Sequence, residues 1–506
     1  MFRYLFYLII GTVCILPVIA AGQTEITSLS QNTDTVGKYE KFELTFTLSE
    51  TYDNPFDPEI VDVSVTFTGV HDKKVARMGK MGYLYRINCD TYSKGDSPMD
   101  ARTEQTMSDI MTRISTWIKP LVEQSARVSS PEATGKLEQQ VRGEGRELLG
   151  SILEALVQNA LDHQPEARKC PTCGQRRRHK GRRPRGLLSS VGALRVTGPY
   201  WYCRQCGGQH ALDCLAPERF SAPMQELLCL LGTALASFAK ASTAAQKLLG
   251  IRVSDATIRR LCMRHGARDE AEPAPVEAGE EVTGSCDGTM VHTRENGWKE
   301  LRAYQFRYGS HKHGRAYLEP ARVFTPRLRQ AAIAIQVITA ARLFWLADAA
   351  AWIDKGVRQQ LPLAIRIIDL WHAWQHIYTA AAGIYPNDED KAHSWARRYC
   401  RVLKGKGALG LLKQLRSLRY APATRQAALD KLRRYLRKHA NHLDYPRYIE
   451  KGYPISSGPM ESFCKQLGQR LKGPGMRWNR ANVTPMATLV SLWANDQWDT
   501  HWRYVA

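Results

Sequence analysis

Four cysteines arranged in two CxxC pairs carry the clearest chemical signal in the sequence. Cys170 and Cys173 lie in the segment CPTCG, and Cys203 and Cys206 lie in the segment CRQCG. Thiolates with this spacing form two tight knuckles that hold one Zn²⁺ ion, and the glycine after each second cysteine relieves the turn. The pattern therefore predicts a structural zinc ribbon, the alternative being two chance pairs in a reduced protein.

A run of basic residues separates the two cysteine pairs. It reads RRRHKGRRPRG, from Arg176 to Gly186, and a protein core does not accommodate such a run. The whole chain has a formal net charge of +22 at pH 7, which favours a polyanionic partner. We expect a basic loop, stapled by zinc, that binds the phosphates of DNA. Its predicted DNA-binding residues are Arg176, Arg177, Arg178, Lys180, Arg182 and Arg183.

Three acidic residues indicate a second kind of chemistry. Asp287 lies in the alternating segment EVTGSCDGTMVH, and Asp348 ends the apolar segment LFWLAD. An isolated carboxylate is costly there, whereas acids at adjoining strand positions favour a cation between them. Glu461 lies in the first turn of a helix predicted to begin near Ser457. Two aspartates and a glutamate can hold two Mg²⁺ or Mn²⁺ ions about 3.5–4 Å apart for phosphoryl transfer; for each acid alone, a helix cap or a surface ion pair is the alternative.

The elements around these acids follow one another in an informative order. Three antiparallel strands are followed by a helix, a strand, a short helix, and a strand that runs into a helix, which is the order of the ribonuclease H-like α/β fold. In the segment DLWH, Asp369 and His372 form a secondary pair after the last strand, and both a role at the metal or DNA and a structural hydrogen bond remain open. The predicted elements are strands over 281–292, 298–309 and 315–324, a helix over 328–342, a strand over 343–348 and the strand-to-helix segment 363–372.

The segment AAQKLLGIRVSDATIRRLCMRHG has the pattern of a helix-turn-helix. Its first helix is expected to end at Gly250, and Ser254 or Asp255 caps the second. An ordinary helical hairpin matches the same pattern, but the neighbouring basic ribbon favours DNA binding. The predicted DNA-binding residues of this helix and of the segment around and after Glu461 are Arg259, Arg260, Lys465, Arg470, Lys472 and Arg477.

The first hundred residues differ from the rest in charge and pattern. Residues 1–72 hold 3 Lys and Arg against 10 Asp and Glu, and the remainder holds 68 against 39. Arg3 and the apolar run that follows it are typical of a secretory signal over 1–22. Alternating segments at 41–48 and 61–69 predict strands, and the region 23–72 resembles the start of an immunoglobulin-like domain of secreted carbohydrate-active enzymes.

This contrast predicts a fusion or a start-site artefact, with a genuine membrane-tethered protein as the alternative. Eight cysteines outside the two pairs are scattered singly, which fits a reduced compartment, so the body is expected in the cytoplasm. A packing or dimerisation helix is expected after Met107. The predicted divisions are a junction at 73–106, a helical region at 107–165, the zinc ribbon at 166–214, the helix-turn-helix at 215–268, a linker at 269–281 and the ribonuclease H-like domain at 282–506 with a helical insertion at about 384–450.

From about residue 107 onward the motif order resembles bacterial insertion-sequence DDE transposases of the Kra type. The resemblance rests on the two CxxCG knuckles, on D-A-x-x-W from Asp348 and D-x-W-H from Asp369, and above all on GYPISSGPMESFCKQLGQRLKGPGMRW at 452–478. It implies that Asp287, Asp348 and Glu461 form the DDE triad, and that Asp369 to His372 match the D/C-x-x-H signature of related transposases. The family pattern has glycine where Ala349 stands.

The function implied by this resemblance is DNA transposition. The protein would bind terminal inverted repeats, nick the DNA at the element ends and join the freed 3′-hydroxyls to target DNA, as a homodimer or higher oligomer in the nucleoid without a functional membrane partner. Two alternatives come from the residues themselves. One is a ribonuclease H-like nuclease that does not join strands, and the other is a non-catalytic DNA-binding protein with a zinc ribbon and a helix-turn-helix.

Overall fold

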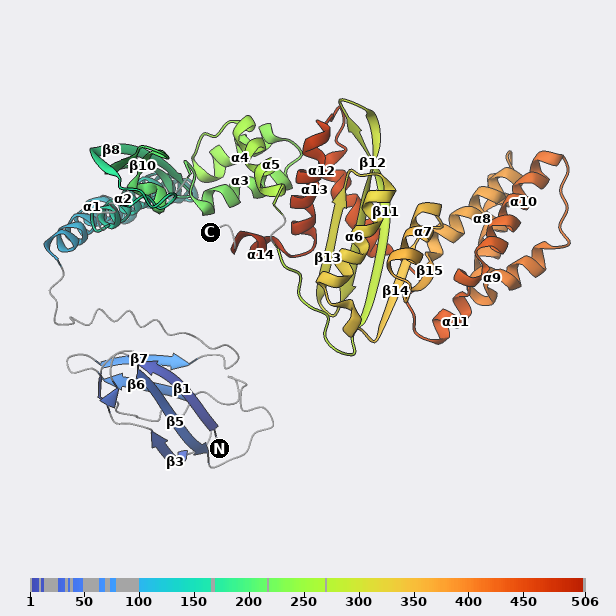
Figure 1. Ribbon diagram of the computed structural model, residues 1–506, viewed down its shortest axis with the longest axis horizontal. Helices are drawn as coiled ribbons and strands as arrows, with labels where there is room; N and C mark the ends of the chain where they lie inside the picture. Colours follow the sequence, from blue (N-terminus) through green and yellow to red (C-terminus); the bar gives the residue numbers. More distant parts are fainter. Residues whose placement is uncertain are drawn as a thin grey trace. The chain divides into compact units, whose positions relative to one another are not determined.

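The computed structural model describes seven strands between Phe2 and Met78 by their backbone, and residues 100–164, 169–215, 218–268 and 271–503. The chain divides into two compact units, Met1–Asp100 and Ala101–Ala506 (Figure 1). Most of the predicted signal-like segment and much of the predicted junction lie outside the described residues. Within the described part of the chain, no helix has the length and apolar character needed to cross a membrane.

The first unit contains two small β-sheets. The strands predicted over 41–48 and 61–69 are observed as β5 and β6. Strand β1 lies within the predicted signal-like segment and pairs antiparallel with β5, and β7 lies within the predicted junction. One sheet has the order β1-β5-β3 and the other β4-β2-β6-β7. The bounds are β1 Phe2–Leu8, β2 Gly11–Thr12, β3 Ile26–Gln31, β4 Thr35–Val36, β5 Glu40–Leu48, β6 Val63–Thr68 and β7 Lys73–Met78.

The second unit begins with a helical hairpin that packs on the cysteine-containing sheet. Helix α1 (Ala101–Ser125) starts six residues before Met107, and α2 (Pro131–Asp162) is capped by Ser130, whose side chain accepts from the N–H of Ala133. The sheet has the order β10-β9-β8. Its elements are β8 Arg178–Ser189, β9 Gly192–Cys203, β10 Gly207–His210 and the short 3-10 helix η1 Ala211–Cys214.

The basic run forms a strand, so the prediction of a basic loop was wrong. Most of the run belongs to β8, which pairs with β9 from Arg178 to Ser189. Arginine tolerates a strand position because its long side chain reaches solvent while the backbone completes the ladder. Strand β10 pairs only with the end of β9, from Tyr200 to Cys203. Helix α2 covers the edge of β9 that this leaves unpaired, where Glu154 accepts from the N–H of Arg195 and Gln158 accepts from the N–H of Thr197.

Three helices follow the ribbon and match the predicted helix-turn-helix boundaries. Helix α4 ends at Gly250, which has a positive φ of 67° that favours glycine. Helix α5 is capped by the hydroxyl of Ser254, which accepts from the N–H of Thr257 at 3.3 Å. The helices are α3 Ala222–Ala234, α4 Phe238–Leu249 and α5 Asp255–Gly266.

A five-stranded mixed sheet forms the centre of the remaining chain. Its order is β13-β12-β11-β14-β15; the first three strands are antiparallel, and β11, β14 and β15 run parallel. The strands are β11 Glu281–Thr293, β12 Gly297–Tyr308, β13 His311–Tyr317, β14 Arg342–Ala347 and β15 Ile365–Ile368.

Two predicted boundaries around the third strand were wrong. The strand ends at Tyr317 instead of residue 324, and the following helix α6 (Ala321–Ala334) starts earlier than predicted. Phe324 and Leu328 are both buried, and their four-residue spacing places them on one helix face. The apolar residues that suggested a strand therefore belong to the first turns of α6, which begins directly after Pro320.

Helices cover both faces of the sheet (Figure 1). Helices α6 and α7 pack on one face, around Phe306 and Trp345, and α12 and α13 pack on the other, around Leu301 and Ala316. Beyond β15 a further group of helices encloses its own apolar core and contains the predicted insertion. The elements are η2 Val337–Thr339, α7 Ala351–Gln360, α8 Leu370–Ile384, α9 Glu389–Leu415, α10 Ala423–Lys438, η3 Ala440–His442, α11 Tyr445–Glu450, α12 Gly458–Leu471, α13 Arg480–Ala494 and α14 Trp498–Arg503.

Candidate functional site

The parallel pairing of β11 with β14 aligns Asp287 with Asp348. The register pairs Glu281 with Arg342 and continues to Ser285 with Leu346, and the two aspartates follow with the same offset two residues later. Their neighbours Cys286 and Ala347 are buried in the core under α6 and α7. Because successive strand side chains alternate, both aspartates point to the opposite face, where α8 and α12 lie.

The two carboxylates influence each other. Burial is the main cause that raises the pKa of Asp287, and the negative charge of Asp348 raises it further. The N–H of Gly288, 2.7 Å from Oδ1 of Asp287, and the imidazole of His372 act in the opposite direction. Asp348 accepts a hydrogen bond from the N–H of Ala350 at 2.9 Å. Two partly buried acids that repel each other form an arrangement suited to a cation.

Glu461 comes to this face on helix α12. The predicted helix start and apolar stripe are observed: Ser457 is the N-cap, and Met460, Phe463, Leu467 and Leu471 are buried. Glu461 itself is exposed, and Cys464, one turn later, lies close enough for its thiol to bind the carboxylate of Asp287. Among the described residues, the donor atoms of Asp287, Asp348 and Glu461 do not converge within 4.8 Å as those of the four cysteines do.

Asp369 has a structural position at the start of α8. It is only 2% exposed and accepts hydrogen bonds from the N–H of His372, at 3.0 Å, and from the N–H of Ser457. The contacts of Asp369 are therefore those of a structural hydrogen-bond acceptor, one of the two roles left open by the sequence. His372 is half-buried and lies near Asp287, whose pKa its charge lowers.

The four cysteines form a closed cluster. Their sulfur atoms all lie within 4.8 Å of one another, and those of Cys173 and Cys203 are 3.6 Å apart. Both knuckles use a glycine with positive φ, 72° at Gly174 and 85° at Gly207. The N–H of Cys173 is the main cause that lowers the pKa of Cys170 to about 6. Four converging thiols with tight turns can hold a metal ion such as zinc.

The basic residues of the ribbon differ in burial and in their side-chain contacts. Arg177 is largely buried and donates to Gln209 at 2.8 Å, while Arg182 pairs with Asp162 on α2. The guanidinium of Arg183 lies 3.9 Å from the centre of the Tyr200 ring. The residues of this group that are exposed on the strand and around the first knuckle are Arg176, Arg178, Lys180, Arg182 and Arg183.

Arg470 lies among the interior residues, unlike the other predicted DNA-binding side chains outside the ribbon. It is 4% exposed, donates to the carbonyl of Gly232 at 2.8 Å, and its guanidinium lies over the rings of Phe238 and Trp478. These contacts join α12 to α3 and α4. The predicted DNA-binding residues in this part of the chain that are exposed are Arg259, Arg260, Lys465, Lys472 and Arg477.

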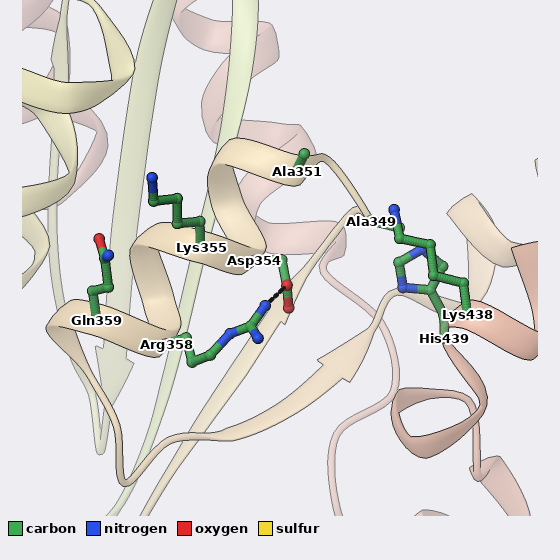
Figure 2. Close-up of a pocket in the computed structure, with 8 residues that line it drawn as sticks. All are labelled: Ala349, Ala351, Asp354, Lys355, Arg358, Gln359, Lys438 and His439. Carbon is green, nitrogen blue, oxygen red and sulfur yellow. Dashed lines mark hydrogen bonds and ion pairs between the residues drawn. The ribbon is translucent and has the colours of Figure 1, made fainter.

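Sequence reasoning missed several residues near the two aspartates. Cys464 could have been found from its position one turn after Glu461. Tyr435 is near enough to Asp348 for the charge of Asp348 to raise its pKa, and nothing in the sequence pattern indicates this. A pocket of about 440 Å³ is lined in part by Ala349, the residue after Asp348 (Figure 2). It was not foreseen because its walls come from α7 and α10, which are far apart in the sequence. Its lining residues are Ala349, Ala351, Asp354, Lys355, Arg358, Gln359, Lys438 and His439.

Comparison with known proteins gives only distant structural likeness. No protein-family model matches the chain, and no curated protein matches it. Five chains of solved structures match. One of them, from the Drosophila P element transposase strand transfer complex, is 8% identical; the match covers 57% of this chain and 81% of that chain with a TM-score of 0.23. A likeness at this level carries no argument about residues or mechanism.

Proposed function

We propose that this chain is a DNA transposase of the Kra type, with a ribonuclease H-like catalytic domain and a DDE triad formed by Asp287, Asp348 and Glu461. The observation that supports the proposal is the parallel register of β11 and β14, which pairs Ser285 with Leu346; Asp287 and Asp348 each follow two residues later along the chain. The sheet order β13-β12-β11-β14-β15 agrees with such a fold.

The side chains at this site suit Mg²⁺ or Mn²⁺. Asp287 and Asp348 supply hard oxygen donors that are partly buried and electrostatically coupled, and Glu461 completes the set from the first turn of α12. Two bound ions supply charge stabilisation and an activated water or 3′-hydroxyl for phosphoryl transfer. The chain itself orients the ligands, since the N–H of Ala350 fixes Asp348 and β11 fixes Asp287.

The proposed DNA-binding parts are the ribbon and helix α5. A Zn²⁺ ion held by Cys170, Cys173, Cys203 and Cys206 fixes the ribbon, whose exposed cations on β8 bind phosphates. Helix α5 is the proposed recognition helix, with Arg259 and Arg260 exposed. The DNA partners are the terminal inverted repeats and the target, and the protein acts in the cytoplasm as a homo-oligomer. The acidic first hundred residues have a separate origin.

Strand cleavage and joining by the purified full chain test the proposal. With Mg²⁺ and DNA that contains the element ends, wild type is expected to cleave and join. Asp287→Asn, Asp348→Asn and Glu461→Gln are each expected to reduce both reactions by at least about 10³-fold, because loss of one ligand loosens the metal pair. DNA binding is expected to survive, since it depends on Lys and Arg side chains elsewhere.

The alternatives give different outcomes in the same assay. Cleavage without any joined product would identify a nuclease. DNA binding without cleavage by wild type would identify a non-catalytic binding protein. Full activity in the Asp348→Asn variant would refute the triad, because this residue is the partner of Asp287 across the two strands.

A further inference from the structure

The pocket beside Asp348 has walls from two separate parts of the fold. It begins at Ala349, directly after Asp348, and lies between α7 and α10; Figure 2 shows Lys355 and Arg358 on one side and Lys438 and His439 on the other. The two walls are also close to Asp348 itself. Ala350 donates its N–H to Asp348, and the charge of Asp348 contributes to raising the pKa of Tyr435, one turn before His439.

The pocket has an excess of positive charge. Asp354 is the acid of the lining, and it forms ion pairs with both Arg358 and Arg366, which neutralise it. Lys355 and Lys438 are exposed, and neither forms an ion pair with any residue that the structure describes. Their ammonium groups are therefore available to an anion in the pocket.

Two further groups are suited to the same anion. Helix α7 has ten residues, begins at Ala351 in the pocket wall, and has no side-chain cap on its first N–H groups, which together with the helix dipole attract negative charge. His439 is only 8% exposed, and among the described residues its ring has no hydrogen-bond partner. An imidazole in the wall of a polar pocket can donate a hydrogen bond to a phosphate oxygen.

We propose that this pocket binds a phosphate group, and that in the working protein the phosphate belongs to the DNA strand next to the bond that is cleaved. The inference rests on the proposed function for the identity of the strand, but the phosphate site itself rests on the pocket. Lys355 and Lys438 would hold the backbone phosphate, and the N-terminus of α7 would fix its position. Free inorganic phosphate has the same chemistry as a backbone phosphate and is the other ligand that fits this pocket.

Equal removal of charge inside and outside the pocket tests this inference. The double variant Lys355→Gln/Lys438→Gln is compared with Lys404→Gln/Lys413→Gln, which removes two exposed lysines from α9. Both are made in the full chain with Asp287→Asn and measured without divalent metal, so that binding does not depend on catalysis. The readout is the affinity for a fluorescent DNA duplex over a series of salt concentrations.

The pocket variant is expected to bind DNA about 10-fold more weakly at moderate salt, with a salt slope that is shallower by about 2, and the α9 variant to change much less. Equal losses in both variants would overturn the inference. Calorimetric titration with inorganic phosphate separates the two sources. If the pocket variant loses phosphate binding but keeps its DNA affinity, the ligand of the pocket is a small phosphate and not the DNA strand. If the pocket variant loses DNA affinity and wild type does not cleave DNA, the phosphate site is supported and the proposed catalysis is refuted.

A second inference comes from the helical hairpin, which carries an uncovered apolar stripe. On α1 the exposed side chains Met107, Met111, Ile118 and Val122 follow a 4-7-4 spacing. At about 100° per residue they share one side of α1, about 140° around the helix from the side where Thr106 and Arg113 donate hydrogen bonds to α2.

The same side of the hairpin continues on α2. The exposed side chains of Leu149 and Leu156 lie about 110° around α2 from the side where Ser151 and Asn159 accept these bonds. Because the two helices are antiparallel, this rotation leads to the same side of the hairpin. Residues 101–162 hold 7 Lys and Arg against 9 Asp and Glu, in a chain whose net charge is +22. A row of exposed apolar side chains without excess positive charge is typical of a protein interface and not of a DNA-binding surface.

We infer that this stripe binds the same stripe of a second copy. The 4-7-4 spacing reads the same in both directions, so a two-fold axis between Ile114 and Ser115 of the two α1 helices pairs Met107 with the second copy's Val122 and Met111 with the second copy's Ile118. Such self-complementarity is the requirement of an isologous dimer. The result is a four-helix arrangement in which α2 adds Leu149 and Leu156 at the margins.

The oligomeric state of the full chain tests this dimer. Light scattering during size-exclusion chromatography at high salt is expected to give a dimer for wild type and a monomer for Met111→Glu/Ile118→Glu. The control Ile338→Glu/Leu363→Glu alters two side chains that are more than four-fifths exposed and should remain dimeric. Equal helix content by circular dichroism excludes unfolding. A monomeric wild type, or a dimer that survives the α1 substitutions, would overturn the inference, the first outcome indicating that another segment covers the stripe.

Discussion

Asp369 accepts a hydrogen bond from the backbone N–H of Ser457, a residue 88 positions further along the chain. The same carboxylate accepts from the N–H of His372, and next to it the N–H of Leu370 donates to the carbonyl of Ile455 at 3.0 Å. One buried side chain thus connects the start of α8 with the start of α12, and α12 carries Glu461. The position of the third acid depends on this connection.

Removal of this carboxylate is expected to cost both stability and activity. Asp369→Ala leaves two N–H groups without their acceptor, which should lower the free energy of unfolding by about 2–4 kcal/mol. DNA cleavage should fall as well, because the first turn of α12 loses its anchor. The matched control is Asp388→Ala, which removes an ordinary cap from α9, at the N–H of Lys391, and should cost about 1 kcal/mol. Urea unfolding and a cleavage assay measure both, and equal effects of the two substitutions would contradict this role.

Loss of a cysteine ligand should release the metal and unfold the ribbon. Cys170→Ser and Cys203→Ser are each expected to lower the zinc content from about one ion per chain toward zero and to weaken DNA binding, because a structural zinc site supplies folding free energy. Cys400→Ser, in the buried face of α9 outside the cluster, should keep its zinc. Metal analysis of the purified wild type and the three variants tests this, and a wild-type chain without zinc would disprove the site.

The protein should lose stability in mild acid through His265. Burial is the main cause that lowers the pKa of this histidine to about 4 from 6.5, and Arg264 adds to the effect. Between these two values the unfolded chain takes up a proton that the folded chain resists, so stability falls as the pH is lowered through this window. His265→Gln removes this term and should flatten the dependence. Urea midpoints of both proteins near pH 7 and near pH 5 test it; parallel pH dependences would contradict it.

A methyl group added at Gly266 should disturb the contact between α5 and α13. A Cβ at this position would overlap the backbone carbonyl of Pro485, which cannot move as a side chain tip can. Gly266→Ala is therefore expected to lower the free energy of unfolding by about 1–3 kcal/mol. At Gly143 of α2 a Cβ meets open space, so Gly143→Ala should raise stability by up to about 1 kcal/mol. Thermal unfolding distinguishes the two, and equal signs would show that the close approach is not rigid.

The features that the sequence predicted well depend on neighbours along the chain. The cap at Ser254, the turn at Gly250 and the stripe that begins at Met460 each reflect contacts within a few residues, and each is found where it was predicted. The alignment of Asp287 with Asp348 was expected only as adjoining strands; the register that puts them opposite each other appears in the folded sheet.

The features that the sequence did not predict depend on distant partners. Arg470 has the same side chain as the exposed arginines, but the rings of Phe238 and Trp478 enclose it, and these belong to other elements. The basic run was assigned to a loop because charge suggested solvent, whereas β9 offered its backbone a partner. Asp369 could be read as a ligand or as a cap, and only the position of Ser457 decides which contacts it makes.

Arg470 and Gly266 also connect the proposed recognition helix with the helix that carries Glu461. Through them the three helices α3–α5 share one core with α12 and α13, so they are not a module on a flexible tether. In the proposed transposase, the helix that reads the bases and the helix that carries Glu461 then move as a single body. The nick then falls at a constant number of base pairs from the recognised sequence. A shift of the binding site along the DNA shifts the nick by the same distance.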